Sequence, residues 1–207
     1  MAKPGKKTVQ EKGVNILLVG VGGQGVIVAS EIICDAALRA GLDAKKSEVH
    51  GMSQRGGVVS SDVRVGLGIT SPLISEGEAD VVLAFEHAEA VRWLHYARTG
   101  GTVIVNTQKI VPPIAFTLGL KYPDESGLTR ASQNGIKVVK VDAFDWAVRL
   151  GDARFANSIL LGVLSGLPDA HIIPEKHWEA ALTERFKGKM AKENLQAFLA
   201  GQKHKAA

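Results

Sequence analysis

The chain has 207 residues, of which 45% are hydrophobic and 22% charged, as expected for one soluble globular domain. Its net charge is +4, but residues 1–12 carry +3 and residues 201–207 carry +2, so the body between them carries −1. A nucleic-acid-binding fold would carry its basic groups on the folded surface, so this distribution argues against nucleic acid as a partner.

Apolar runs that suit buried strands alternate along the chain with runs of helical period. The first run, VNILLVG at 14–20, is continuously apolar, as in a strand covered on both faces. A helix is predicted over 24–40, where apolar residues recur every fourth position before Gly41. Two more strands are predicted at 44–49 and 58–65. The second alternates clearly, and segment 67–74 is one candidate for its hairpin partner.

The rest of the chain continues the alternation of strands and helices. Strands are predicted at 79–85, 101–107 and 136–143, and helices at 86–98, 125–134 and throughout the stretch after Phe144. This order predicts an α/β fold: a doubly wound, mostly parallel Rossmann-like sheet with a helical C-terminal segment. We expect a single domain over 13–200, between flexible tails at 1–12 and 201–207.

The lone cysteine and the N-terminal region indicate the cellular location to expect for the protein. Cys34 excludes an internal disulfide, cannot alone hold an iron–sulfur cluster, and lies in a helical pattern typical of a buried core thiol. The first long apolar run is broken by glycines and polar residues, unlike a membrane span. We therefore expect a cytoplasmic protein with no membrane partner.

A glycine-rich turn, GVGGQG, follows the first predicted strand. Its spacing satisfies G-x-G-x-x-G at a strand-to-helix junction, where backbone N–H groups and the positive end of the helix favour an anion. The turn therefore indicates either a phosphate or nucleotide site, or simply close packing of the first helix on the sheet. Its candidate site residues are Gly20, Gly22, Gly23, Gln24 and Gly25.

A dinucleotide-binding protein would add an acid near the end of the second strand, to hold a ribose. Glu48, 23 residues after Gly25, lies in that region. However, the sequence has no separate substrate domain, and Gln24 is an uncommon residue in a nicotinamide site. A free-standing NAD(P)-dependent oxidoreductase therefore remains an alternative, as does a non-catalytic nucleotide-sensing or assembly module.

A second loop, rich in donors, lies between the strands predicted at 44–49 and 58–65. The glycine turn follows the strand predicted at 14–20, and this loop follows the strand predicted at 44–49. In a parallel sheet the carboxyl ends of neighbouring strands share one edge, so we expect both loops to face one site. Arg55 can bind a carboxylate or phosphate, or pair with a neighbouring acid. His50 can carry a proton or be held by backbone groups. The candidate residues of this loop are His50, Gln54, Arg55, Gly56 and Gly57.

Together these segments resemble a known family. Residues 19–66, from VGVGGQG to SSDVRVG, resemble the opening of the gamma-type subunit of 2-oxoacid:ferredoxin oxidoreductases. The segment SEVHGMSQRGG at 47–57 resembles the beta (small) subunits of indolepyruvate:ferredoxin oxidoreductases more than the pyruvate or 2-oxoglutarate members. The likeness continues at NSILLG (157–162) and FKGKMAKENLQAFLAG (186–201), so it spans nearly the whole chain.

The resemblance implies oxidative decarboxylation of aryl 2-oxoacids such as indolepyruvate to aryl-acetyl-CoA, with coenzyme A as co-substrate and ferredoxin as the indirect electron acceptor. Thiamine diphosphate, magnesium and iron–sulfur clusters are then expected in a large partner subunit, and this chain is expected to be inactive alone. The Gly-Asp-Gly and following asparagine that usually anchor the thiamine metal are absent here. Another 2-oxoacid:ferredoxin oxidoreductase remains an alternative.

In such an enzyme the two loops would face the large subunit. They would either complete the active-site wall and hold part of coenzyme A, or serve as interface structure without touching a ligand. Asn157 is expected to cap a helix or bond within the interface, chiefly as a structural residue. The tryptophans lie on helical patterns that indicate core or interface burial: Trp93, Trp146 and Trp178.

Overall fold

A six-stranded sheet forms the centre of the fold, and the computed structural model describes residues 13–50, 57–111 and 121–204 around it. The strand order is β2-β3-β1-β4-β5-β6. The strands are β1 (Val14–Val21), β2 (Asp43–His50), β3 (Val58–Gly66), β4 (Ala79–Ala84), β5 (Ala97–Asn106) and β6 (Lys137–Val141). The helices are α1 (Val26–Arg39), α2 (His87–Arg92), α4 (Ser126–Gln133), α5 (Ala143–Arg149), α6 (Ala156–Ser165), α7 (Glu175–Arg185) and α8 (Lys189–Gln202).

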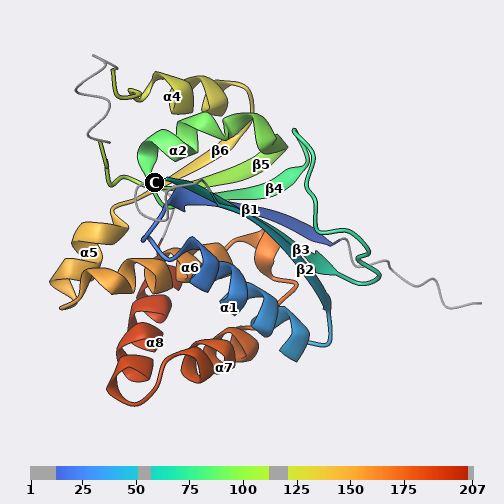
Figure 1. Cartoon of the computed structure of the whole chain (residues 1–207), viewed down its shortest axis with the longest axis vertical. Coiled ribbons are helices and arrows are strands. Elements are labelled where there is room, and N and C mark those ends of the chain that lie inside the picture. Colours follow the sequence, from blue (N-terminus) through green and yellow to red (C-terminus); the bar gives the residue numbers. More distant parts are fainter. Residues whose placement is uncertain (1–12, 51–56, 112–120, 205–207) are drawn as a thin grey trace, which may run out of the picture.

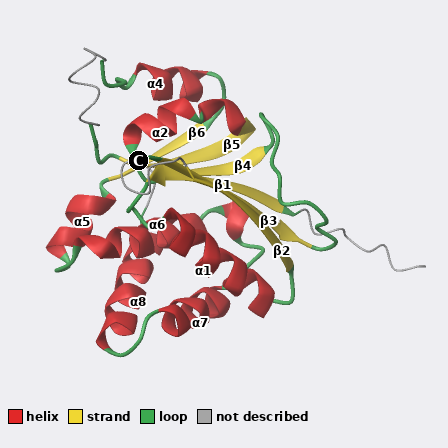
Figure 2. Ribbon diagram, in the orientation of Figure 1, coloured by secondary structure: helices red, strands yellow, loops and turns green. Residues whose placement is uncertain are grey.

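Helices cover both faces of the sheet, which confirms the predicted α/β fold (Figure 1). α1 and α5–α8 form one layer, and α2 and α4 form the other (Figure 2). Along β1, Ile16 and Leu18 pack toward the first layer, whereas Leu17 and Val19 pack toward the second. A strand buried on both faces needs apolar residues at every position, which explains the continuous run at 14–20.

The sheet is mixed rather than uniformly parallel. β1, β4, β5 and β6 run parallel to one another, whereas β2 and β3 form an antiparallel hairpin, and β3 also pairs antiparallel with β1. The predicted pairing of β3 with segment 67–74 is therefore wrong. β3 lies between two strands, and its Val59, Val63 and Val65 are buried beneath the α1 layer, as their alternation predicted.

Some predicted boundaries shift. The helix predicted over 86–98 ends as α2 at Arg92; a 3₁₀ turn at Leu94–Tyr96 follows, and β5 already begins at Ala97, which pairs with Ala79. α8 continues to Gln202, so it includes the first two residues of the segment expected to be a tail. Trp178 is fully buried, whereas Trp93 and Trp146 are half-buried.

Two glycines allow α6 and α8 to cross with their backbones in contact. A Cβ on Gly162 would overlap the carbonyl oxygen of Phe198, and a Cβ on Gly201 would overlap that of Ile159. Both glycines lie in the C-terminal segments NSILLG and FKGKMAKENLQAFLAG. Both segments therefore need glycine at these positions, because together they form one tight helix–helix contact.

Candidate functional site

The glycine turn lies at the carboxyl end of β1 and leads into α1. Gly23 and Gly25 have φ angles of 101° and 78°, in the region that favours glycine. At Gly25 an added Cβ would also overlap the side-chain amide of Asn157. The turn thus requires glycine for conformation at both positions and for close approach at Gly25.

Gln24 fills the turn and connects three strand ends. Its Oε1 accepts a hydrogen bond from the N–H of Val21 at 2.8 Å. Its Nε2 donates to the carbonyl oxygen of Phe85, after β4, at 2.9 Å, and to Oε1 of Gln108, after β5, at 3.3 Å. A side chain with both an acceptor and a donor is needed for this arrangement, which explains a glutamine in the turn.

Asn157, at the start of α6, holds the turn from the other side. Its Nδ2 donates to the carbonyl oxygen of Gly25 at 3.2 Å. α6 is in turn fixed to α8, where Ser158 Oγ donates to Asn194 Oδ1 at 2.7 Å in a buried position. Asn157 does not cap α6, whose N-cap is Phe155 and has no side-chain cap hydrogen bond, so that part of the expectation is wrong. Its side chain instead fixes the turn within the chain.

The second loop reaches the same edge of the sheet. The N–H of Gly22 donates to the carbonyl oxygen of Gly57 at 2.8 Å, and Val21 pairs with Val58. The described end of the second loop therefore meets the turn through the antiparallel pairing of β1 with β3, whereas we predicted that the two loops follow parallel neighbouring strands. The predicted site residues Gln54, Arg55 and Gly56 and the side chain of His50 lie outside the described residues.

Glu48 does not occupy the position of a ribose-binding acid. It lies on β2, which is separated from β1 by β3, and its Oε1 is 2.6 Å from Nζ of Lys46. In the dinucleotide fold, the acid follows a parallel strand directly beside the first one. The arrangement therefore counts against the NAD(P)-dependent alternative.

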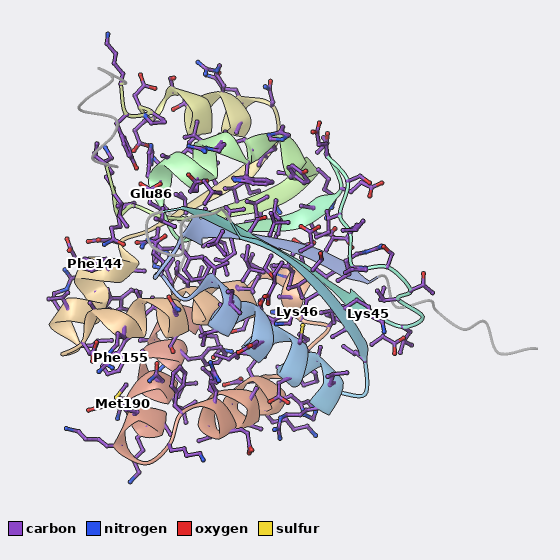
Figure 3. The ribbon with its side chains drawn as sticks, viewed as in Figure 1. Lys45, Lys46, Glu86, Phe144, Phe155 and Met190 are labelled. Atoms are coloured by element: carbon purple, nitrogen blue, oxygen red, sulfur yellow. The ribbon has the colours of Figure 1, made fainter. Side chains whose placement is uncertain are left out.

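A cavity of about 560 Å³ opens beside the glycine turn, in the size range of ligand sites. Apolar side chains form much of its wall, and Figure 3 labels one of them, Phe144 of α5. Carboxamide groups supply most of its polar side chains. Besides the turn, the lining residues are Val28, Phe85, Asn106, Gln108, Ile110, Phe144, Ala153, Arg154, Ala156, Asn157, Leu160 and Phe186.

Arg154 is the charged side chain among these described lining residues, and we did not predict it from the sequence. Its Nε lies 3.0 and 2.9 Å from the two carboxylate oxygens of Asp152. This hydrogen bonding lowers the pKa of the Asp152 carboxyl below its usual value. Because a lone arginine in a helical pattern has many ordinary roles, the sequence offered no signal that would single it out.

Glu86, which follows β4 and is 1% exposed, is a second residue that we did not predict from the sequence. Its carboxylate accepts hydrogen bonds from the N–H groups of Glu89 and Ile110, at 3.0 and 2.9 Å, and from the Tyr122 hydroxyl. A signal was present, since the acid directly ends the apolar run VVLAF, at the edge of the sheet where ligand-binding loops gather.

The described residues offer a poor donor set for a metal or cluster. Over 13–50, 57–111 and 121–204, His, Cys, Asp and Glu form no group of three that could hold a metal ion. Cys34, predicted to be buried, is half-buried on α1, and desolvation raises the pKa of its thiol to about 11. Within the same ranges, no helix is long and apolar enough to cross a membrane.

Comparison with known proteins agrees with this architecture. The subunit IorB of the indolepyruvate oxidoreductase from Archaeoglobus fulgidus is 40% identical over 188 residues, which cover 90% of this chain and 92% of that one. Its counterpart from Pyrococcus horikoshii is 37% identical over 196 residues, covering 93% and 96% of the two chains. The crystal structure of pyruvate oxidoreductase subunit PORC from Thermotoga maritima has a TM-score of 0.71 at 23% identity, covers 92% and 96% of the two chains, and shows the same fold.

The family described as pyruvate ferredoxin/flavodoxin oxidoreductase matches residues 15–203. This match spans every strand and helix of the fold except the first residue of β1. It includes the glycine turn, Glu86, Asn157 and the α6–α8 contact. The chain therefore belongs to the pyruvate ferredoxin/flavodoxin oxidoreductase family.

Proposed function

We propose that this chain is the small subunit of an indolepyruvate:ferredoxin oxidoreductase. The observation that carries the proposal is the level of identity, 35–41% to four IorB subunits, three of them matched over at least nine-tenths of their length. Common gamma subunits of pyruvate/ketoisovalerate oxidoreductases are 26% identical over a similar length. The higher sequence identity to the IorB subunits favours the indolepyruvate branch over the other 2-oxoacid enzymes.

The proposed reaction is the oxidative decarboxylation of an aryl 2-oxoacid to an aryl-acetyl-CoA, with electrons passing to ferredoxin. Thiamine diphosphate with magnesium would supply the decarboxylation chemistry and iron–sulfur clusters the electron transfer, both in a large partner subunit. This chain does not fit a cluster, because its one cysteine is a half-buried thiol with a raised pKa, whereas clusters need a set of thiolates. Its contribution must come from shape and hydrogen bonding.

We assign that contribution to the glycine turn (Gly20–Gly25) and the second loop (His50–Gly57), which would face the large subunit. Three observations support this assignment: Gly22 bonds to Gly57, a cavity opens beside the turn, and α1 begins there with its positive end. The loops would complete the active-site wall and hold part of coenzyme A. Alternatively, they would serve as interface structure only.

The basic test is co-expression with a thiamine-dependent large subunit and an assay of dye reduction. Indolepyruvate should support reduction by the pair, and the large subunit without this chain should be inactive. Pyruvate and 2-oxoglutarate serve as matched substrates for the alternative members of the family. Efficient turnover of either one, with none of indolepyruvate, would contradict the proposed substrate.

Substitution of Arg55 separates the two roles of the loops. In the reconstituted enzyme, Arg55→Ala should raise the KM for coenzyme A by roughly 10-fold if the guanidinium binds a phosphate. Loss of co-purification with the large subunit would instead support the interface role. Unchanged kinetics with unchanged assembly would exclude both roles for Arg55.

A further inference from the structure

Glu86 is a buried acid directly after the apolar run VVLAF. It follows the end of β4, its side chain is almost fully buried, and Figure 3 labels it at the edge of the sheet. Within the described part of the chain, no lysine, arginine or histidine forms an ion pair with it. A buried carboxylate is costly unless hydrogen bonds satisfy it, so its donors indicate what the residue does.

One carboxylate oxygen performs an ordinary helix-capping role. Glu86 is the N-cap of α2, and its Oε2 accepts from the N–H of Glu89 at 3.0 Å. Serine, threonine, aspartate and asparagine are preferred for capping because they are short. A cap therefore explains one hydrogen bond and leaves the greater length of glutamate unexplained.

The other oxygen, Oε1, holds the segment that follows β5. It accepts from the N–H of Ile110 at 2.9 Å and from the hydroxyl of Tyr122. Burial, together with the adjacent Glu86 carboxylate, raises the pKa of the Tyr122 phenol, so the hydroxyl remains a donor. Beside this contact, the N–H of His87 donates to the carbonyl oxygen of Gln108 at 3.1 Å.

The segment fixed in this way is a wall of the cavity. Residues 107–111 form neither helix nor strand, so these contacts determine where their backbone lies. Ile110 and Gln108 both line the cavity, and Gln108 Oε1 is 3.3 Å from Gln24 Nε2 in the glycine turn. Glu86 therefore helps to fix the position of this wall of the cavity relative to the turn.

We propose that Glu86 is a positioning residue of the active-site wall, acting through its hydrogen bond to the N–H of Ile110; the inference rests on the proposed function of the cavity. Two conservative variants separate this role from helix capping. Glu86→Asp keeps the charge and a favoured cap but is too short to reach Ile110 as well. Glu86→Gln keeps the length and an acceptor for Ile110, but its amide nitrogen cannot accept from Glu89.

The two roles predict opposite orders of damage. In the reconstituted enzyme, positioning predicts that Glu86→Asp lowers kcat/KM for indolepyruvate or coenzyme A by roughly 10- to 100-fold in protein that is still folded at the assay temperature. Its melting temperature should also fall, because the hydrogen bonds from Ile110 and Tyr122 are lost. Glu86→Gln should keep kcat/KM within about threefold, although its melting temperature falls. Simple capping predicts the reverse order, with kinetics that follow stability.

The wild-type pair separates the possible failures. If wild-type chains assemble but indolepyruvate yields no reduction, the proposed function fails. If the wild-type pair is active and Glu86→Asp matches it, the positioning role fails alone. Loss of folded protein in both variants would assign Glu86 to folding and would also overturn the positioning role.

Discussion

Replacement of Gly162 by alanine tests the inference that α6 and α8 pack with their backbones in contact. The added Cβ would lie 2.8 Å from the nitrogen of Gln202 and 2.9 Å from the carbonyl carbon of Phe198, and would overlap the Phe198 oxygen. All three atoms belong to the backbone of α8. No side-chain rotation relieves this overlap, so α8 must move away from α6.

The cost can be estimated from two opposing effects. Overpacking of this kind costs about 1–3 kcal/mol, and more where backbone must shift. Alanine is favoured over glycine inside a helix by up to about 1 kcal/mol, which offsets part of the loss. We therefore expect a net destabilisation of about 2 kcal/mol, or a fall in melting temperature of about 4–8 °C for a domain of this size.

Thermal and urea unfolding followed by circular dichroism provide the measurement. Gly127→Ala on α4 is a matched control, because its Cβ would meet a side-chain methyl, Cγ1 of Val91, at 2.9 Å. A methyl can shift where a backbone cannot, so the control should lose less than about 1 kcal/mol. Equal losses in the two variants, or a stabilised Gly162→Ala protein, would refute the argument from backbone contact.

Two further predictions concern the turn and the lone thiol. Gln24→Glu removes the donor to Phe85 and Gln108 and places acceptor oxygens together, so the free energy of unfolding should fall by about 1–3 kcal/mol. Urea unfolding measures this change. A loss below about 0.5 kcal/mol would contradict the proposed hydrogen bonding. The Cys34 pKa of about 11 leaves roughly a thousandth of the thiol as thiolate at pH 8, with a tenfold gain per pH unit up to the pKa. Iodoacetamide should therefore label the native protein far more slowly than the urea-unfolded protein, and similar rates would refute the shift.

The sequence was sufficient for the strands and helices because each carries its own local signal. β1 is largely apolar because helices cover both of its faces. In α1, apolar residues recur every fourth position, and a glycine follows the helix. The antiparallel pairing of β2 and β3 could also have been predicted from the sequence. Residues 51–57 between them number seven, whereas a parallel crossover needs a dozen or more.

The residues that contact the glycine turn could not be predicted from the sequence. Gln24 and Gln108 are separated by 84 positions, and Asn157 and Gly25 by 132. Each is a common polar residue in an ordinary local context, and only the folded sheet brings them together. The spacing of the glycines predicted where a site lies, but not which side chains complete it.

These long separations also show that the shape of the site depends on distant parts of the fold. The turn is held by Asn157 of α6, α6 is held by α8, and the opposite wall is held by Glu86 beyond β4. The local sequence of the turn supplies glycine freedom but little rigidity, because glycine has many accessible backbone conformations. Its geometry therefore depends on nearly the whole domain, so a perturbation at the α6–α8 contact should reach the cavity without touching it.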